Sequence, residues 1–328
     1  MKTKILALLR ESSEYISGQE LCDRFGVSRT AVWKAVKQLK EEGYRIEAVQ
    51  NKGYKLMESP DVLSENELKN GMNTAWAGQT LYYFEKTGST NTDAKRYAEE
   101  GAPHGTLIVA DFQQNGRGRR GRMWQAPAGC NVYFTIVLRP NLKPDKASML
   151  TLVMALSVAK AIVAQSGLEA YIKWPNDIVV HKKKVCGILT EMTLEMETKE
   201  IQYVVIGVGI NINQKEFPEE IRETAGSLFM ESGKEISRAG IVQKVMEFFE
   251  KDYEAFLQAG DMSGVREDYN RLLINRDSQV KVLDPQGDYT GIARGINDRG
   301  ELLVEREDGK VENVYAGEVS VRGLYGYV

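Results

Sequence analysis

Residues 116–122 read GRGRRGR and are followed by Met123 and Trp124. Four arginines and three glycines in seven residues cannot belong to a hydrophobic core, so this stretch predicts an exposed loop. Glycines let a backbone approach an anion closely and offer it N–H groups. Arginine binds phosphate or carboxylate in a forked geometry and does not lose its charge. The stretch therefore predicts a loop that holds a polyanionic or mixed-anhydride ligand. On composition alone, a flexible basic loop for nucleic acid is the alternative.

The chain on both sides of this loop alternates between strand-like and helix-like patterns from about Leu63 to Asn275, which predicts one large α/β domain. The expected strands cover residues 106–111, 131–138, 170–173, 178–180 and 201–209. The expected helices cover residues 92–100, 147–166 and 240–259.

A second polar stretch, KWPND at residues 173–177, ends one of the expected strands. Three lysines at 182–184 follow it, directly before the apolar run VCGIL at 185–189. Taken alone, this pattern favours a β-hairpin with an Asn-Asp turn and a solvated lysine tip. Lys184 differs from its neighbours because it abuts the apolar strand. It is therefore the lysine that can point inward and neutralise a carboxylate and a phosphate that are brought together. If the strand register were shifted by one residue, Lys183 would take this position instead.

Two further motifs have open interpretations. TGSTN at residues 87–91 lies at a strand-to-helix junction. Its side chains either cap the helix, which is their commoner use, or offer neutral hydrogen-bond partners to an uncharged polar ligand. GVGININ at residues 207–213 contains glycines that either permit tight sheet packing or face a nucleotide, and Gly-x-Gly alone is a weak nucleotide signal.

Residues 1–58 predict three short helices and a hairpin. Apolar residues recur one turn apart in two short helices. Gly26 and Ser28 then provide a tight turn and an N-cap before a third helix over 29–42. Two strand-like runs over 44–57 follow. Helix, turn, helix and hairpin is the order of a winged helix-turn-helix.

The third helix carries a basic stripe opposite its apolar side. An ordinary solvated helix face is the alternative explanation of such a stripe. However, residues 1–58 contain 11 Lys and Arg against 8 Asp and Glu, so this head carries a net charge of +3 and the remainder carries −6. The turn, the wing and this charge favour DNA contact. The expected DNA-binding residues are Ser28, Arg29, Thr30, Trp33, Lys34 and Lys37.

Residues 276–328 consist of short β-rich runs separated by Gly and Asp turns, which predicts a small barrel. The runs cover residues 279–283, 289–296, 302–306, 310–315 and 319–322. Residues 58–61 read ESPD and look like a linker. We therefore expect a multidomain α/β (α+β) protein. Its expected parts are a winged helix-turn-helix with its linker over 1–62, a mixed α/β domain over 63–275 and the barrel over 276–328.

Composition narrows the class of protein. Hydrophobic residues make up 42% and charged residues 27%, which is ordinary for a soluble globular chain. We expect no apolar run of the roughly 18 residues that a membrane span needs, and no signal peptide, so we expect a cytoplasmic chain. The three cysteines lack metal-ligand spacing. Only two histidines are present, so Lys, Arg, Asp and backbone groups must carry any chemistry.

The four motifs, in this order, resemble those of the biotin–protein ligase family, and in particular its bifunctional members that also repress biotin genes. The resemblance covers essentially the whole chain, including the helix-turn-helix and a C-terminal barrel similar to an SH3 domain. It implies that the biotin carboxylate attacks the α-phosphate of ATP and that a lysine of a biotin carboxyl carrier protein then attacks the adenylate. It also implies operator DNA, a homodimer in the adenylate-bound state and no membrane partner. ATP use implies Mg²⁺, for which the sequence assigns no ligands.

The resemblance implies roles for individual residues. Lys184 and Arg119 would be catalytic, with Lys184 in contact with the biotin carboxylate and the α-phosphate. The biotin site would consist of Ser89, Thr90, Asn91, Gln113, Arg117, Gly118, Arg119 and Lys184. The ATP and adenylate site would consist of Arg119, Arg122, Trp124, Lys173, Asp177 and Asn211. The charges agree with this division, because a neutral ureido head requires neutral partners and the anionic centre requires Arg and Lys.

Two rival functions are alternatives. A lipoate–protein ligase shares the expected catalytic fold but would lack the loop at 116–122 and the head. A transcription factor whose former enzyme domain only senses biotin would need no complete anion site, so Arg119 and Lys184 argue against it.

Overall fold

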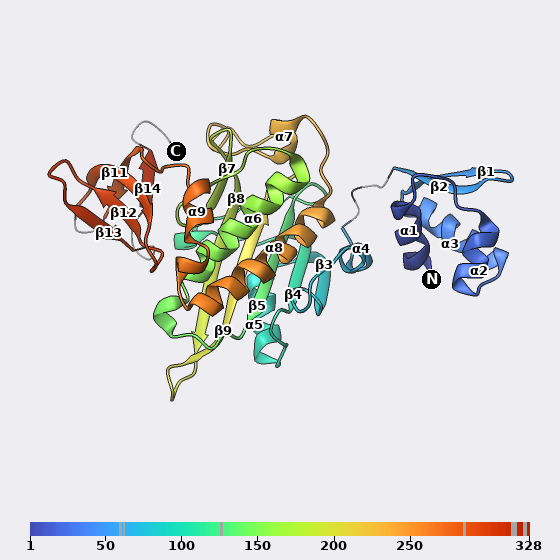
Figure 1. The fold of residues 1–328 in the computed structure, drawn as a ribbon, viewed down its shortest axis with the longest axis horizontal. Coiled ribbons are helices and arrows are strands. Elements are labelled where there is room, and N and C mark those ends of the chain that lie inside the picture. The colour runs from blue at the N-terminus through green and yellow to red at the C-terminus, as the bar shows by residue number, and fades with distance from the viewer. Residues whose placement is uncertain (59–60, 62, 125–126, 285–286, 316–319, 324–326) are drawn as a thin grey trace. The chain divides into compact units, whose positions relative to one another are not determined.

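The computed structural model describes residues 1–328 except residues 59–60, 62, 125–126, 285–286, 316–319 and 324–326. The chain separates into two compact units, Met1–Gly71 and Met72–Val328 (Figure 1). The expected boundary between head and body followed residue 62. Residues 59–60 of the expected linker lie outside the described residues.

The larger unit is built on a seven-stranded mixed sheet in the order β3-β4-β5-β9-β8-β7-β6. Its strands are β3 (Leu81–Thr87), β4 (Leu107–Gln113), β5 (Val132–Leu138), β6 (Tyr171–Lys173), β7 (Asp177–Val180), β8 (Lys183–Leu194) and β9 (Ile201–Ile210). Its helices are α5 (Thr90–Glu99), α6 (Met149–Ser166), α7 (Leu228–Ser232), α8 (Arg238–Ala259) and α9 (Arg266–Leu272). The β3–β4 pair is parallel and the other neighbouring strands are antiparallel. The mixed α/β architecture is the expected one.

The two faces of this sheet differ. Helices α6 and α8 lie side by side across one face (Figure 1). Phe134, Val208 and Ile188 are cross-strand neighbours buried on that face. Helix α5 packs on the opposite face, where Val205 and Val137 join its apolar cluster. Residues 207 and 209 of β9 share the face of Val205, because side chains alternate along a strand.

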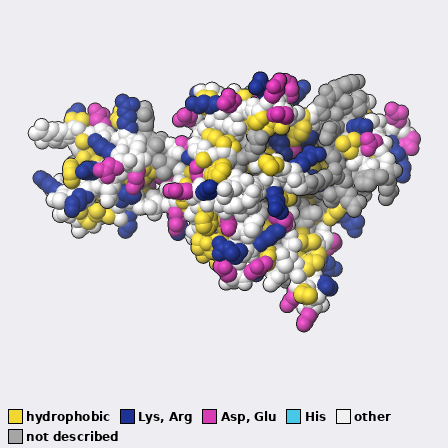
Figure 2. Space-filling model, turned by 180° about the vertical axis from the view of Figure 1, so that it is seen from behind, with side chains coloured by type: hydrophobic (Ala, Val, Ile, Leu, Met, Phe, Trp, Pro, Cys, Tyr) yellow, Lys and Arg dark blue, Asp and Glu magenta, His cyan; other side chains and the backbone are white. Residues whose placement is uncertain are grey.

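Helix α6 corrects one expectation. The helical stretch Pro144–Ser166 has the length and composition of a membrane span, with a mean hydropathy of 2.0, although the sequence predicted no such segment. In the structure, 72% of its apolar window is buried, and α6 packs against both the sheet and α8. It is therefore the core helix of this unit. On the surface seen in Figure 2, Lys and Arg side chains are interspersed with Asp and Glu side chains.

The smaller unit is the expected winged helix-turn-helix. Its elements are α1 (Lys2–Glu11), α2 (Gly18–Phe25), α3 (Arg29–Glu41), β1 (Arg45–Val49), β2 (Gly53–Glu58) and α4 (Glu65–Asn70). Gly26 is left-handed with φ of 63°, and the Ser28 side chain caps α3, as expected. Val32, Val36 and Leu39 bury the inner side of α3, which leaves its basic stripe outside.

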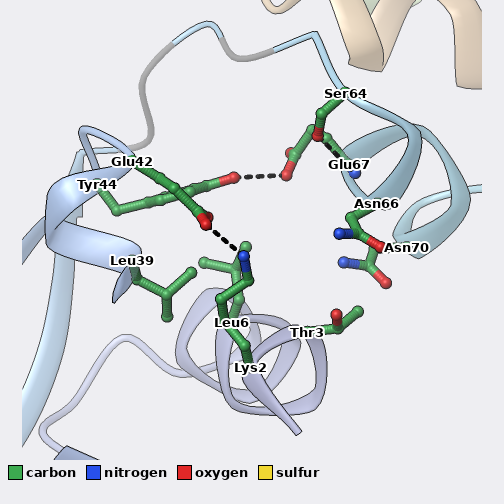
Figure 3. A pocket seen from close by; sticks show the side chains of 10 residues that line it. All are labelled: Lys2, Thr3, Leu6, Leu39, Glu42, Tyr44, Ser64, Asn66, Glu67 and Asn70. Atoms are coloured by element: carbon green, nitrogen blue, oxygen red, sulfur yellow. Dashed lines mark hydrogen bonds and ion pairs between the residues drawn. The ribbon is translucent and has the colours of Figure 1, made fainter. Parts of the chain in front are cut away.

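Helix α4 was not predicted from the sequence. One buried carboxylate, that of Glu67, connects it to the rest of the head. Glu67 accepts hydrogen bonds from the Tyr44 hydroxyl at 2.7 Å and from the Arg10 guanidinium. Burial and the bond to Glu67 raise the pKa of Tyr44. Glu67 and Tyr44 border a pocket of about 180 Å³ between α1, α3 and α4 (Figure 3). The carboxylate therefore joins three separate segments of the head.

The C-terminal strands form an antiparallel sheet in the order β13-β12-β11-β10-β14, consistent with an SH3-like domain. They are β10 (Gln279–Leu283), β11 (Tyr289–Ile296), β12 (Leu302–Glu305), β13 (Val311–Val314) and β14 (Ser320–Gly323). They match the expected runs closely, and residue 319 of the last run lies outside the described residues.

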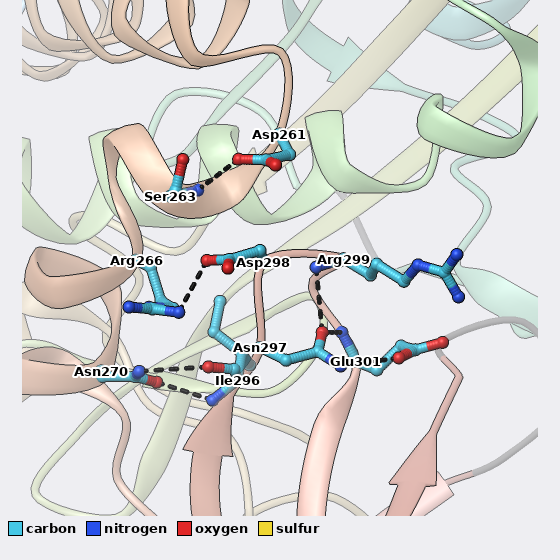
Figure 4. A network of polar contacts seen from close by, with 9 residues as sticks. All are labelled: Asp261, Ser263, Arg266, Asn270, Ile296, Asn297, Asp298, Arg299 and Glu301. Carbon is cyan, nitrogen blue, oxygen red and sulfur yellow. Dashed lines mark hydrogen bonds and ion pairs between the residues drawn. The ribbon is translucent and has the colours of Figure 1, made fainter.

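A polar network fastens this sheet to the central domain (Figure 4). The Asn270 side chain of α9 accepts a hydrogen bond from Ile296 N at 2.7 Å, and Arg266 pairs with Asp298 at 2.7 Å. The Trp174 indole N–H donates to the Gly300 carbonyl at 3.1 Å. The turn between β11 and β12 is thus held directly against the KWPND motif.

Candidate functional site

Hydroxyl and amide groups expected to bind a neutral ligand meet at the start of α5. Ser89 is the N-cap residue, yet its side chain makes no capping hydrogen bond, so its hydroxyl is not used to cap the helix. The Gln113 Oε1 atom accepts hydrogen bonds from the Thr90 backbone N–H and hydroxyl at 2.7 and 3.0 Å. That arrangement leaves the amide N–H groups of Gln113 as donors for another partner.

Two residues that the sequence analysis did not identify hold Asn91. Thr135, a buried hydroxyl on β5, donates to Asn91 Oδ1 at 2.7 Å. The Asn91 amide nitrogen donates to Glu191 Oε2 at 2.8 Å, so both ends of this amide are fixed. Thr135 is a lone polar residue within the apolar run VYFTIVL, and this pattern could have identified it from the sequence. The sequence carried no comparable signal for Glu191.

Three glycines form the floor of the site on the α5 face of the sheet. Gly209 pairs across the strands with Gly187, and Gly207 lies two residues away on β9. A Cβ atom on Gly207 would lie 1.9 Å from Asn91 Oδ1, and one on Gly209 would lie 2.8 Å from Trp124 Nε1. A Cβ atom on Gly187 would also meet the Trp124 ring, at 2.8 Å. These glycines therefore make room for Asn91 and Trp124.

The loop at 116–122 closes on itself through backbone hydrogen bonds of 2.7 and 2.9 Å. Its Arg119 guanidinium donates to Asn176 Oδ1 at 3.0 Å, which links the loop to the KWPND motif. The sequence analysis placed Asn176 in the expected turn but did not assign it to the site. Arg117 and Arg122 are exposed. One arginine of the loop is thus anchored and at least two face solvent.

Trp124 brings an unsatisfied donor into the site. Its indole nitrogen is buried and has no hydrogen-bond partner within the described part of the chain. Leaving a buried N–H unpaired costs about 1–3 kcal/mol, so this group points to a ligand acceptor. The Lys184 ammonium lies 5.3 Å from the Trp124 ring centroid.

Lys184 and Lys183 point to different places. The Lys184 Nζ atom lies 2.6 Å from Asp177 Oδ1, across the β7–β8 hairpin. The Lys183 ammonium instead donates to the backbone carbonyls of Arg222 and Glu223, at 3.2 and 2.5 Å. Lys184 is therefore the lysine that faces Asp177 and Trp124.

Two other expected site residues are almost fully buried. Lys173 is 6% exposed, and its backbone lies opposite that of Asp177 in the β6–β7 hairpin. The turn of this hairpin consists of residues 174–176, and not of the expected Asn-Asp pair, because Asp177 already begins β7. Asn211 is 4% exposed, and its amide donates to the Gly226 carbonyl at 3.1 Å. Its backbone N–H donates to Val185 next to Lys184. Asn211 therefore lies at the end of β9, close to the same strand as Lys184.

The site thus has neutral hydrogen-bonding groups at one end and the Lys184 and Arg119 cations at the other. Together, the fold and this site define a carboxylate-activating ligase that carries a DNA-binding head. Over 311 residues the chain is 40% identical to the bifunctional ligase/repressor BirA of Bacillus spizizenii, covering 94% of each chain. The chain belongs to the family of bifunctional biotin–protein ligases and repressors, and it is a biotin–protein ligase with a helix-turn-helix repressor domain.

Other comparisons agree with this assignment. Residues 83–211 match the biotin/lipoate A/B protein ligase family, residues 2–55 match an HTH domain, and residues 277–322 match the biotin protein ligase C terminal domain. The BirA ligase/repressor of Escherichia coli is 30% identical, covering 97% of this chain and 96% of that one. The structure of biotin protein ligase from Aquifex aeolicus in complex with biotin and ATP superposes with a TM-score of 0.64 at 30% identity, covering 75% of this chain and 99% of that chain.

Proposed function

We propose that the chain joins biotin to ATP as biotinyl-adenylate and then transfers biotin to a lysine of a biotin carboxyl carrier protein. The observation that supports this most is the division of the site between neutral and cationic groups. The uncharged ureido head suits the Ser89 hydroxyl and the Gln113 amide. A carboxylate meeting a phosphate gathers negative charge, which suits the Lys184 ammonium beside it.

In the first step, a biotin carboxylate oxygen attacks the α-phosphate and pyrophosphate leaves. Lys184 would lie between the two anions and lower their repulsion, and the ion pair with Asp177 directs this lysine. Arg119, anchored to Asn176, holds the loop over the adenylate. In the second step, the carrier amine attacks the biotin carbonyl, AMP leaves and the amine loses its proton. Lys184 and Arg119 are thus the proposed catalytic residues.

The remaining assignments complete the two subsites. The biotin site also takes Thr90, Asn91, Arg117 and Gly118. The ATP and adenylate site also takes Arg122, Trp124, Lys173, Asp177 and Asn211. For Mg²⁺, no group of three His, Cys, Asp or Glu side chains converges within the described residues. Mg²⁺ commonly keeps several waters and binds through substrate phosphates, so it would arrive with ATP, and we propose no protein ligand for it.

We also propose that the head binds operator DNA, that the adenylate-bound protein is a homodimer and that it works in the cytoplasm. Support for DNA contact comes from α3, where all six expected residues are exposed and Trp33 is 54% exposed. A large aromatic side chain beside Lys34 and Lys37 suits contact with a phosphate backbone and its sugars. As functional domains we propose residues 1–62, 63–275 and 276–328.

Biotin-dependent exchange of labelled pyrophosphate into ATP tests the ligase proposal. We expect exchange with biotin, none with lipoate, and a loss of ~10²–10³ in rate for Lys184→Ala, as for a charge aligned with the transition state. Lys183→Ala is the matched control and should keep the parent rate. Absence of exchange in the parent protein would leave only a biotin-sensing role.

A further inference from the structure

A tyrosine from the C-terminal part of the chain reaches the catalytic motif. Tyr327 follows β14, and its hydroxyl donates a hydrogen bond to Asp177 Oδ2. Its ring also covers the Lys173 ammonium, with the nitrogen 3.2 Å from the ring centroid. One side chain therefore contacts both the first and the last residue of the KWPND motif.

We propose that Tyr327 is a positioning residue for adenylate formation. It holds the Asp177 carboxylate and the Lys173 ammonium so that the Lys184 ammonium stays directed into the site. This inference rests on the proposed function of Lys184. Tyr327 itself is not assigned a contact with biotin or ATP.

The charges explain why such a residue is needed. Tyr327 contacts the Lys173 ammonium with its ring and the Asp177 carboxylate with its hydroxyl, and Lys184 pairs with the same carboxylate. Oδ1 of Asp177 is 2.6 Å from Lys184 Nζ, while Oδ2 accepts the Tyr327 hydroxyl. Because Oδ2 is held by the Tyr327 hydroxyl, Oδ1 stays turned towards Lys184 in the ion pair. A hydrogen bond to an ionised group is stronger than a neutral one, so it can fix this orientation.

The aromatic ring acts on the second lysine. Lys173 is 6% exposed, so its ammonium is largely shielded from water. The face of an aromatic ring attracts a cation by about 2 kcal/mol or more when the pair is desolvated. The ring thus gives the Lys173 ammonium a partner, and in this proposal that partner keeps Lys173 from drawing Asp177 away from Lys184. Both contacts of Tyr327 therefore act on the position of one ammonium.

Single-turnover formation of biotinyl-adenylate by the full chain tests this inference. A misplacement of about 1 Å at a reacting group can cost ~10²-fold in rate. We expect Tyr327→Leu to slow the step ~100-fold, and Tyr327→Phe, which keeps the ring, to slow it ~10-fold. Biotin affinity without ATP should fall less than the rate, because Tyr327 acts on the biotin site only through Lys184.

The matched control is Tyr315→Phe, which removes the hydroxyl of an exposed tyrosine directly after β13, 3.4 Å from Ser148 Oγ. It should keep the parent rate. The double variant Tyr327→Phe with Asp177→Asn should be no slower than Asp177→Asn alone, because the hydroxyl acts through Asp177. General destabilisation would instead make the double variant slower than Asp177→Asn alone, so this comparison separates the two explanations.

Several outcomes would overturn the inference. They are Tyr327 variants within twofold of the parent rate, a faster rate, an equal reduction in Tyr315→Phe, or a slower rate accompanied by an equal loss of biotin affinity or by a lower Tm. Lys184→Ala in the same assay separates the roles of the lysine and the tyrosine. A parent-like rate for Lys184→Ala would contradict the role of Lys184. A slow Lys184→Ala variant together with parent-like rates for the Tyr327 variants would contradict only the role of Tyr327.

Discussion

Gly207 places the tightest steric limit on the site. Because a Cβ atom there would lie 1.9 Å from Asn91 Oδ1, Gly207→Ala must displace Asn91 from Thr135 and Glu191. Breaking one or two such hydrogen bonds costs about 1–3 kcal/mol, so we expect biotin affinity to fall ~10- to 100-fold. Isothermal titration with biotin measures this. Gly18→Ala in the head, where the nearest atom is 3.7 Å away, should bind biotin normally, and equal affinity in both variants would contradict the prediction.

His104 gives the stability of the central domain a predictable dependence on pH. Burial and the nearby charge of Arg139 lower the pKa of His104, and its Nδ1 atom accepts the Arg139 backbone N–H at 3.0 Å. The unfolded chain, with a pKa near ~6.5, therefore binds more protons than the folded chain as pH falls. The contribution of neutral His104 is complete above that value and is lost as pH decreases towards the folded pKa.

The test compares the parent with His104→Asn, whose side-chain oxygen can accept the same bond without titrating. Urea unfolding at several pH values between about 5 and 8 gives the free energy of unfolding of each. We expect the parent to lose stability more steeply below about pH 6.5. Parallel curves for the two proteins would show that His104 does not carry this dependence.

Single residues differ in how far sequence could identify them. Lys184 was selected by its place directly before an apolar run, and the structure directs it to Asp177. Thr135, Glu191 and Tyr327 act on partners 44, 100 and 150 residues away. Such contacts depend on how the strands assemble, and no local pattern encodes them.

Helices and strands, like single residues, differ in whether the local sequence encodes them. Helix α3 and strands β10 and β11 matched because cap, periodicity and turn residues encode them locally. Helix α4 has only six residues, too few for a stable isolated helix, so tertiary contacts must support it. Those contacts run through Glu67 to Arg10 and Tyr44, and the sequence does not reveal them.

A prediction at the level of this element follows from the buried carboxylate. Glu67→Gln keeps the shape but removes the charge that Arg10 requires, and breaking a buried pair typically costs ~3–5 kcal/mol. We expect a lower unfolding temperature for the head in calorimetry, with adenylate formation unchanged. The control is Glu65→Gln on the same helix, which removes an exposed pair with Lys69 worth about 0.3–0.5 kcal/mol. Equal effects of the two changes would show that Glu67 does not secure α4.

At the scale of the whole molecule, the charges are distributed unevenly. Residues 1–58 carry a net charge of +3 and the remainder carries −6, so the head is net basic and the rest of the chain is net acidic. One recognition helix with two nearby lysines neutralises few phosphates, and affinity for DNA rises with that number. If the head binds operator DNA as proposed, we expect two heads on a twofold-symmetric site, with half-sites multiples of ~34 Å apart, because a single head would bind weakly.

Operator binding should consequently respond to the ligase substrates. A ligand shifts assembly only through different affinities for the two states, and an adenylate that binds the dimer better would supply that difference. We predict that biotin with ATP tightens binding to a labelled biotin-operon fragment, and that Lys184→Ala, which makes little adenylate, does not show this response. Lys34→Ala with Lys37→Ala should weaken binding with and without the ligands, and should reduce the slope of log affinity against log salt by about 1 for each phosphate that is no longer neutralised. Equal affinity of the parent with and without biotin and ATP would contradict the corepressor proposal while leaving the ligase assignment intact.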